Sequence, residues 1–130
     1  MSTAQKNLVI IIEDEFDISN MFKMAAELVP DYDIEIIEDG TAALKRLEGD
    51  RLPSVVILDL HLPYVEGDEF LRAARNDPRW KNVAIYIVTG DARAADRHLR
   101  HPEGANGVFV KGAMSIDEIQ VMLEKHKNKV

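Results

Sequence analysis

Five short apolar runs, most of them rich in β-branched residues, constrain this chain more than any other feature. The runs are Leu8–Ile12, Ile34–Ile37, Val55–Leu58, Val83–Val88 and Val108–Val110. Three of them are almost continuously apolar, which is typical of strands covered on both faces. Each run except the last is separated from the next by a longer, more polar stretch. Within 130 residues, this alternation predicts one α/β domain with a parallel sheet, right-handed crossovers and helices on both faces.

The stretches between the runs carry apolar residues at helical spacing. This pattern predicts helices over residues 17–29, 41–47, about 70–77 (ending before Pro78) and 116–123. Ser115 with Glu118 three residues later is typical of a helix start. Residues 92–100 predict a helix with a weak apolar face, because Leu99 is their only bulky apolar residue.

Charge and composition exclude several classes of protein. The chain has 16 Lys+Arg against 23 Asp+Glu, a net charge of −7, which disfavours direct nucleic-acid binding. It has no cysteine, so disulfides, zinc–thiolate sites, iron–sulfur clusters and a cysteine nucleophile are excluded. The apolar runs are far shorter than the roughly 20 residues that span a bilayer, so no membrane insertion is predicted. With no signal peptide visible in the first residues, we expect a cytoplasmic protein.

Charged and hydroxyl side chains follow the ends of the apolar runs. Ligand sites in open α/β sheets lie outside the carboxyl ends of the strands. The residues at this edge are Glu13, Asp14 and Glu15 after the first run, Asp59 after the third, Thr89, Gly90 and Asp91 after the fourth, and Lys111 after the fifth. We interpret Glu15 as an acid at a helix start rather than a ligand.

If the first and third strands are neighbours, Glu13, Asp14 and Asp59 bring several negative charges together. Such crowding is unfavourable unless a cation joins the carboxylates, and a hard divalent ion such as Mg²⁺ prefers these ligands. A carboxylate can also accept a phosphoryl group as an acyl phosphate. The Thr89 hydroxyl and the Lys111 ammonium could then position and neutralise the phosphoryl oxygens.

Taken in order, these residues resemble a response-regulator receiver domain over about residues 8–127. The motifs are VIIIEDE, VVILDLHLP with Pro63 and Gly67 four and eight residues after Asp59, YIVTG, and GANGVFVKG. The resemblance implies a flavodoxin-like fold with five parallel strands in the order 2-1-3-4-5. It also implies site roles: Asp59 as phosphoacceptor, Glu13, Asp14, Asp59 and the His61 carbonyl as Mg²⁺ ligands, Thr89 as switch hydroxyl, and Lys111 as phosphoryl contact. His61, Gly90 and Asp91 are candidates for tuning the reaction.

The same resemblance implies a signalling switch rather than an enzyme, with slow autodephosphorylation at most. The phosphoryl group would come from a histidine kinase or a phosphotransfer protein, and phosphorylation of Asp59 would switch binding to a downstream protein. We expect residues 1–130 to form a single receiver domain with its core at about 7–127. It would either stand alone or be part of a longer chain.

Two departures from the family leave alternatives open. Val108 replaces an aromatic residue that the family often has, and the nearby Phe109 should face the other side of the sheet. Gly112 replaces a proline, which predicts a trans Lys111–Gly112 bond and an unusual φ for the glycine. A pseudo-receiver that binds proteins without phosphorylation is therefore an alternative. An aspartate-nucleophile phosphatase is disfavoured by His61, which stands where that class needs a second Asp, and a flavodoxin-type carrier by the acidic first turn.

Overall fold

The computed structural model describes residues 6–91, 93–94, 96–97 and 104–128, and these form a single parallel sheet flanked by helices. The strands are β1 (Asn7–Ile12), β2 (Tyr32–Ile37), β3 (Val55–Asp59), β4 (Ala84–Thr89) and β5 (Gly107–Val110). Their order is β2-β1-β3-β4-β5, and all neighbouring pairs are parallel. The predicted fold class and strand order are confirmed, and each strand begins and ends within two residues of its apolar run.

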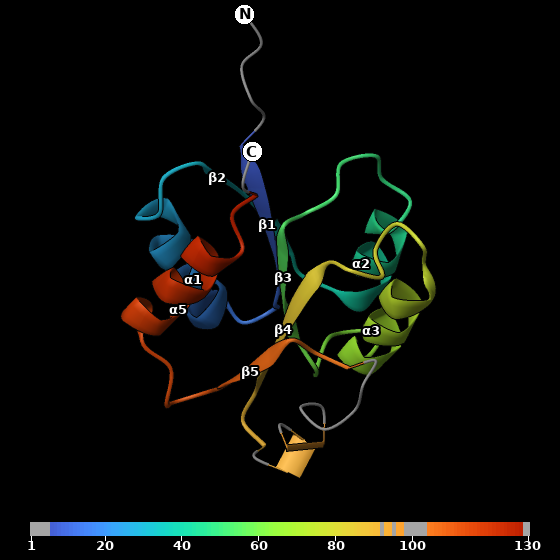
Figure 1. Cartoon of the computed structure of the whole chain (residues 1–130). Helices are drawn as coiled ribbons and strands as arrows, with labels where there is room; N and C mark the ends of the chain where they lie inside the picture. Colours follow the sequence, from blue (N-terminus) through green and yellow to red (C-terminus); the bar gives the residue numbers. More distant parts are fainter. Residues whose placement is uncertain (1–5, 92, 95, 98–103, 129–130) are drawn as a thin grey trace, which may run out of the picture.

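Among the helices of the described residues, two cover each face of the sheet. In Figure 1, α1 (Phe16–Glu27) and α5 (Ile116–Lys125) lie on one side, and α2 (Gly40–Arg46) and α3 (Gly67–Asn76) lie on the other. The Ser115 side chain accepts a hydrogen bond from the Glu118 amide at 3.2 Å, which confirms the predicted helix start. The helix predicted over 92–100 falls largely outside the described residues, although 93–94 and 96–97 are helical.

Alternating side chains of the strands build one apolar layer on each face. Ile10, Ile12 and Leu58 belong to the layer beneath α2 and α3. Val9, Ile11 and Ile57 belong to the layer beneath α1 and α5. Phe109 is buried in this second layer while Val108 packs against the first, so the two residues face opposite sides of the sheet as predicted.

The loop after β3 folds closely against the end of that strand. The Gly67 amide donates to the Leu60 carbonyl at 2.9 Å, and a Cβ atom on Gly67 would overlap the Asp59 carbonyl oxygen. Glycine is therefore required here to let α3 begin directly beside Asp59. In the same loop, Tyr64 has a φ of 70°, which a bulky residue adopts rarely.

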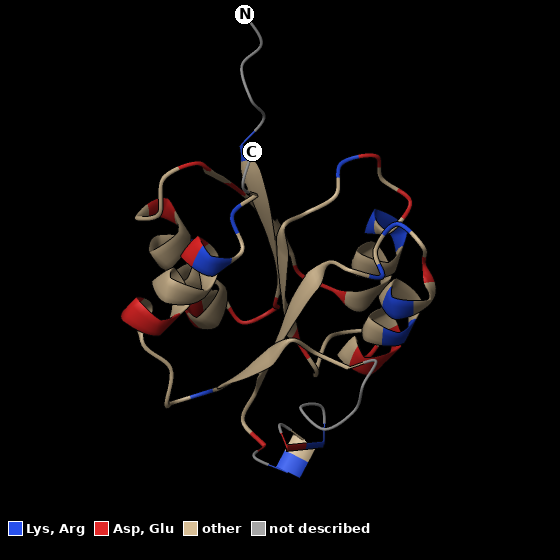
Figure 2. Ribbon diagram, in the orientation of Figure 1, with Lys and Arg blue, Asp and Glu red and all other residues tan. Residues whose placement is uncertain are grey.

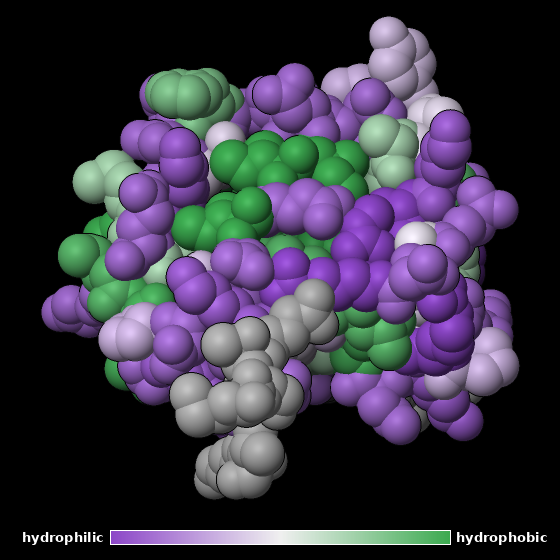
Figure 3. All heavy atoms as spheres, turned by 90° about the horizontal axis from the view of Figure 1, so that it is seen from above, coloured by the Kyte–Doolittle hydropathy of each residue, from purple (hydrophilic) through white to green (hydrophobic). Residues whose placement is uncertain are grey.

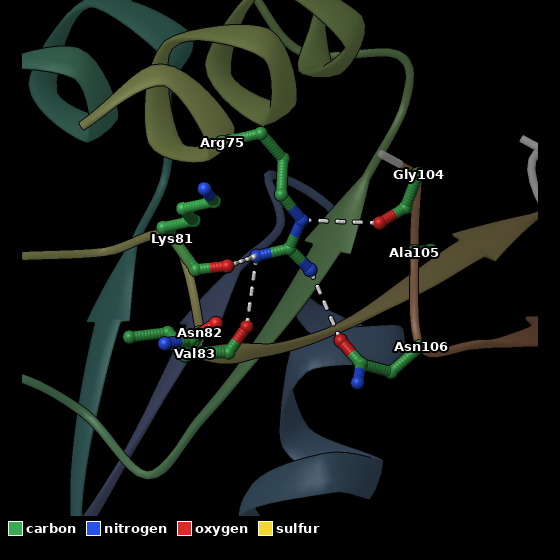
Figure 4. Close-up of a pocket in the computed structure, with 7 residues that line it drawn as sticks. All are labelled: Arg75, Lys81, Asn82, Val83, Gly104, Ala105 and Asn106. Carbon is green, nitrogen blue, oxygen red and sulfur yellow. Dashed lines mark hydrogen bonds between the residues drawn. The ribbon is translucent and has the colours of Figure 1, made fainter. Parts of the chain in front are cut away.

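At the opposite end of the sheet, where the strands begin, Arg75 joins three segments beside a hollow of about 340 Å³ (Figure 4). The contacts of its guanidinium are Nε to the Gly104 carbonyl (3.1 Å), Nη1 to the carbonyls of Lys81 (3.2 Å) and Val83 (2.9 Å), and Nη2 to Asn106 Oδ1 (3.0 Å). The same Asn106 oxygen accepts from the Ile85 amide at 2.8 Å. The last turn of α3 thus holds the segments that lead into β4 and β5.

Trp80 fills the core near this end of the sheet. Its side chain is fully buried, its indole donates to the Leu47 carbonyl at 3.1 Å, and its ring packs edge-on against Phe70.

Figure 3 shows the surface of the molecule seen from above. On this surface, an apolar area is surrounded by hydrophilic side chains. Within the described part of the chain, no helix is both long and apolar enough to cross a membrane.

Candidate functional site

The strand register brings the predicted site residues to one edge of the sheet. Ile12 pairs with Leu58, Asp59 with Val88, and Thr89 with Val110. Side chains at and just after these positions therefore converge where the strands end. Figure 2 shows the acidic segment after β1 and the lysine after β5 on this lower side of the sheet. Glu13, Asp14, Asp59, Thr89 and Lys111 all belong to this edge, as the sequence predicted.

The acidic cluster consists of Glu13, Asp14 and Asp59. Each offers one carboxylate oxygen, and the three oxygens lie within 4.8 Å of one another. Glu13 and Asp59 are almost fully buried, at 2% and 1% exposure, whereas Asp14 is exposed. Burial and, after it, the neighbouring Asp59 raise the pKa of Glu13 to about 8. A negative charge on Glu13 beside Asp59 is therefore unfavourable, and a bound cation would favour the ionised carboxylate.

The carboxylate oxygens of the cluster are ligands that suit a hard divalent cation. Glu13 Oε2 accepts from the Glu15 amide at 3.1 Å, but the buried Glu13 Oε1 has no hydrogen-bond partner among the described residues. A buried oxygen without a partner is unfavourable, and Mg²⁺ is bound through carboxylate oxygens and water. Glu13, Asp14 and Asp59 are thus the residues that would hold such an ion.

His61 follows the cluster in the loop after β3. Its backbone amide donates to Asp59 Oδ1 at 3.1 Å, which places the main chain of His61 beside the cluster. Its imidazole is exposed, and Nδ1 lies 3.6 Å from Glu66 Oε2. The side chain is therefore turned to a partner in its own loop, while only the backbone contacts the Asp59 carboxylate.

Lys111 brings a positive charge into the cluster directly after β5. Its Nζ atom lies 3.3 Å from Asp59 Oδ2 and 3.7 Å from Glu13 Oε1. Its amide donates to the Thr89 carbonyl at 2.8 Å, which continues the pairing of β4 with β5. Lys111 is therefore held by the sheet at its backbone and by carboxylates at its ammonium group.

Thr89 is the last residue of β4, and its side chain is fully buried. Its hydroxyl accepts a hydrogen bond from the Asp91 amide at 3.1 Å. Gly90, between them, is exposed, and a Cβ atom added to it would have no neighbour within 4 Å. Thr89 is thus fixed at the edge, whereas Gly90 and Asp91 lie at its open side.

The loop after Lys111 confirms the backbone expected from the glycine that follows it. The Lys111–Gly112 bond is trans, and Gly112 has a φ of 87°. This left-handed conformation is accessible to glycine and unfavourable for other residues. The chain therefore delivers the Lys111 ammonium without a cis bond.

Glu15 is the functional candidate that sequence reasoning missed. It does precede α1, as a helix-start acid would, but its side chain makes no capping hydrogen bond. Its carboxylate instead accepts from Lys111 Nζ at 3.0 Å, the shortest contact of that ammonium group. Only the folded sheet brings the Lys111 side chain, which follows β5, within reach of the β1–α1 loop, so spacing along the sequence gave no signal of this contact.

Comparisons with known proteins agree with this fold. Residues 9–124 match the response regulator receiver domain family. Response regulator Rre1 of Synechocystis is 24% identical over 88% of this chain and 49% of its own length. The "Probable chemotaxis protein CheY" of Rhizobium etli is 27% identical over 95% of both chains. The solved Mn²⁺-bound response regulator Rcp1 superposes with a TM-score of 0.78 at 20% identity, covering 95% of this chain and 96% of its own.

The chain belongs to the response regulator receiver domain family, because the family match covers most of its length. It is therefore a receiver domain of two-component signal transduction, a class of signalling switches rather than enzymes. The chain spans about half the length of Rre1, which continues beyond the matched region. The structural likeness to Rcp1 supports the fold alone, since the identity is low.

Proposed function

We propose that this domain accepts a phosphoryl group on Asp59 in a Mg²⁺-dependent reaction, and that phosphorylation switches its binding to a downstream protein. The observation that carries the proposal is the Asp59 carboxylate. It is buried beside Glu13 Oε1, which has no hydrogen bond among the described residues, and Lys111 Nζ lies 3.3 Å from Asp59 Oδ2. A buried carboxylate is rarely left beside another one without a chemical role.

In the proposed step, an Asp59 carboxylate oxygen attacks the phosphorus of a donor phosphohistidine. A P–O bond forms, the P–N bond breaks, and its electron pair leaves with the imidazole, which then takes up a proton. The phosphohistidine belongs to a histidine kinase or a phosphotransfer protein. A divalent ion held by Glu13, Asp14, Asp59 and the His61 carbonyl would supply positive charge to the phosphoryl oxygens.

Thr89 and Lys111 would then contact the phosphoryl group. The Lys111 ammonium neutralises one oxygen, and the Thr89 hydroxyl, which accepts from the Asp91 amide, turns toward the phosphoryl group and donates its proton to another oxygen. This exchange would reposition the segment after β4 and shift the population of the domain toward a second arrangement. His61, Gly90 and Asp91 flank the open side and would tune the slow loss of the phosphoryl group to water.

We further propose that residues 7–127 act as one receiver unit whose two states are read by a protein partner. Supporting this, residues from β1, β3, β4 and β5 meet at one edge, so a change at Asp59 is felt by several elements. The net charge of −7 argues against nucleic acid as the direct target.

Incubation with Mg²⁺ and acetyl phosphate, followed by intact-mass measurement, tests this function. We expect one added phosphoryl group in the wild type, none in Asp59→Asn, and none after chelation of the metal. Asp17→Asn, which removes an exposed carboxylate from the first turn of α1, serves as control and should react like wild type. A wild-type chain that also stays unmodified with a phosphorylated kinase domain would favour the pseudo-receiver alternative.

A further inference from the structure

Lys111 is shared by three carboxylates that differ in burial. Its ammonium lies 3.0 Å from Glu15, 3.3 Å from Asp59 and 3.7 Å from Glu13. The Glu15 side chain is 60% exposed, whereas those of Glu13 and Asp59 are 1% exposed. The closest partner of the lysine is therefore also the one that stands outside the cluster, toward solvent.

The acidic cluster holds the backbone of Glu15 in place. Its backbone amide donates to Glu13 Oε2 at 3.1 Å, at the turn that starts α1. The side chain is free of any capping bond and reaches across to the loop after β5. The ammonium is therefore drawn outward by Glu15 as well as inward by Asp59 and Glu13.

A lysine and a divalent cation compete for the same buried carboxylates. If the ammonium settled fully on Glu13 and Asp59, it would neutralise part of the charge that attracts the metal and would repel the metal directly. A carboxylate at the mouth of the cluster that holds the ammonium reduces this competition. Two other acids nearby do not offer this, since Asp14 belongs to the cluster itself and Asp17 is not among the ion-pair partners of Lys111 in the described residues.

We propose that Glu15 is a positioning residue that holds the Lys111 ammonium at the mouth of the cluster, leaves Glu13 and Asp59 to a divalent cation, and yields the ammonium when Asp59 carries a phosphoryl group. This inference rests on the proposed function, because it assigns a purpose to the metal and to Lys111. It separates two roles of one lysine. Before phosphorylation Glu15 keeps the ammonium from settling fully on Glu13 and Asp59, and afterwards the ammonium is supplied to the phosphoryl oxygens.

A double-mutant cycle with Mg²⁺ itself as the probe tests the inference without any phosphorylation. Isothermal titration should show that Glu15→Gln weakens Mg²⁺ binding by about three- to tenfold, a coupling size usual for contacting charges. In a Lys111→Met background, the same Glu15→Gln change should alter the dissociation constant by less than about twofold. Asp17→Asn, the matched loss of one exposed carboxylate, should also stay below about twofold.

An equal weakening in both backgrounds, or an equal weakening by Asp17→Asn, would overturn the inference, since long-range charge alone would then explain the effect. If the wild type binds Mg²⁺ and Glu15→Gln binds it with the same affinity, the inference is overturned while the proposed function stays intact. Failure of the wild-type chain to bind Mg²⁺ would overturn both.

A second measurement reads the ion pair in metal-free protein. In NMR spectra of the lysine side-chain ammonium groups, the Lys111 signal should move in Glu15→Gln and stay in place in Asp17→Asn. An unmoved Lys111 signal in Glu15→Gln would show that Glu15 does not hold the lysine.

Discussion

Arg75 and Lys111 lie at opposite ends of the same sheet, and their partners differ in kind. Arg75 donates to the carbonyls of Gly104, Lys81 and Val83 and to the Asn106 side chain, all of them neutral oxygens. Lys111 lies among three carboxylates, one of them exposed and two buried. Burial lowers the pKa of Arg75, whereas the surrounding acids raise that of Lys111.

This difference separates a structural cation from a functional one. The acceptors around Arg75 are mostly backbone carbonyls of the turns that lead into β4 and β5, and its guanidinium joins these turns to α3. The carboxylates around Lys111 compete for one ammonium and leave Glu13 Oε1 without a hydrogen bond. The Lys111 ammonium can therefore change partners when a cation or a phosphoryl group binds. Stability should therefore depend on the first end and signalling on the second.

The largest effect on stability should come from Arg75→Met. Loss of the guanidinium leaves several carbonyl oxygens without a donor, so we expect the free energy of unfolding to fall by about 2–4 kcal/mol in urea denaturation. Arg72→Met, at an exposed position of the same helix, should change it by about 0.5 kcal/mol or less. Equal effects of the two substitutions would remove the distinction between the two cations.

Asp59→Asn should raise the free energy of unfolding when no metal is present. The asparagine keeps an oxygen for the His61 amide but removes the charge that crowds Glu13. We expect the metal-free protein to gain about 1 kcal/mol in free energy of unfolding. Urea denaturation with chelator and then with Mg²⁺ measures this gain, which should shrink when the ion is present. A loss of stability under chelation would mean that the Lys111–Asp59 attraction outweighs the repulsion.

Gly112→Ala should lower the free energy of unfolding by about 1 kcal/mol. Alanine is strained at a φ of 87°, although the space around the position is open. The second expected effect is a change in the rate of phosphorylation by acetyl phosphate, since the loop delivers Lys111. Thermal melts and a phosphorylation time course check the two parts. Gly90→Ala, also in open space but without a positive φ, is the control and should leave stability almost unchanged.

The smallest effect concerns His126 and the pH dependence of stability. Burial, and then Lys125, lower the pKa of His126, whose ring lies 2.7 Å from the Tyr86 hydroxyl. As pH falls through about 6.5, the unfolded chain takes up a proton that the folded histidine resists, so the free energy of unfolding should decrease. His126→Gln should weaken this dependence between neutral pH and about pH 5. Parallel pH profiles for the two proteins would show that other groups dominate.

The fold class could be predicted because the apolar runs are nearly continuous and most stretches between them carry apolar residues at helical spacing. Continuous apolar runs such as Leu8–Ile12 need cover on both faces, and the order of strands followed from the family resemblance. The cluster at the strand ends could be predicted too, because parallel strands end at a common edge. The Glu15–Lys111 contact could not, since 96 residues separate the two and only the packed sheet brings them together. The Arg75 contacts were missed for a related reason: backbone carbonyl acceptors leave no pattern in a sequence.

The position of Trp80 determines what tryptophan fluorescence can report about this protein. It is the chain's single tryptophan, fully buried near the end of the sheet where the strands begin and hydrogen-bonded to the Leu47 carbonyl. Its emission should change sharply when the core opens and hardly at all when charge is rearranged around Asp59 at the far edge. Intrinsic fluorescence is thus a faithful probe of unfolding for every variant above, whereas occupancy of the acidic edge needs a label or a resonance placed there.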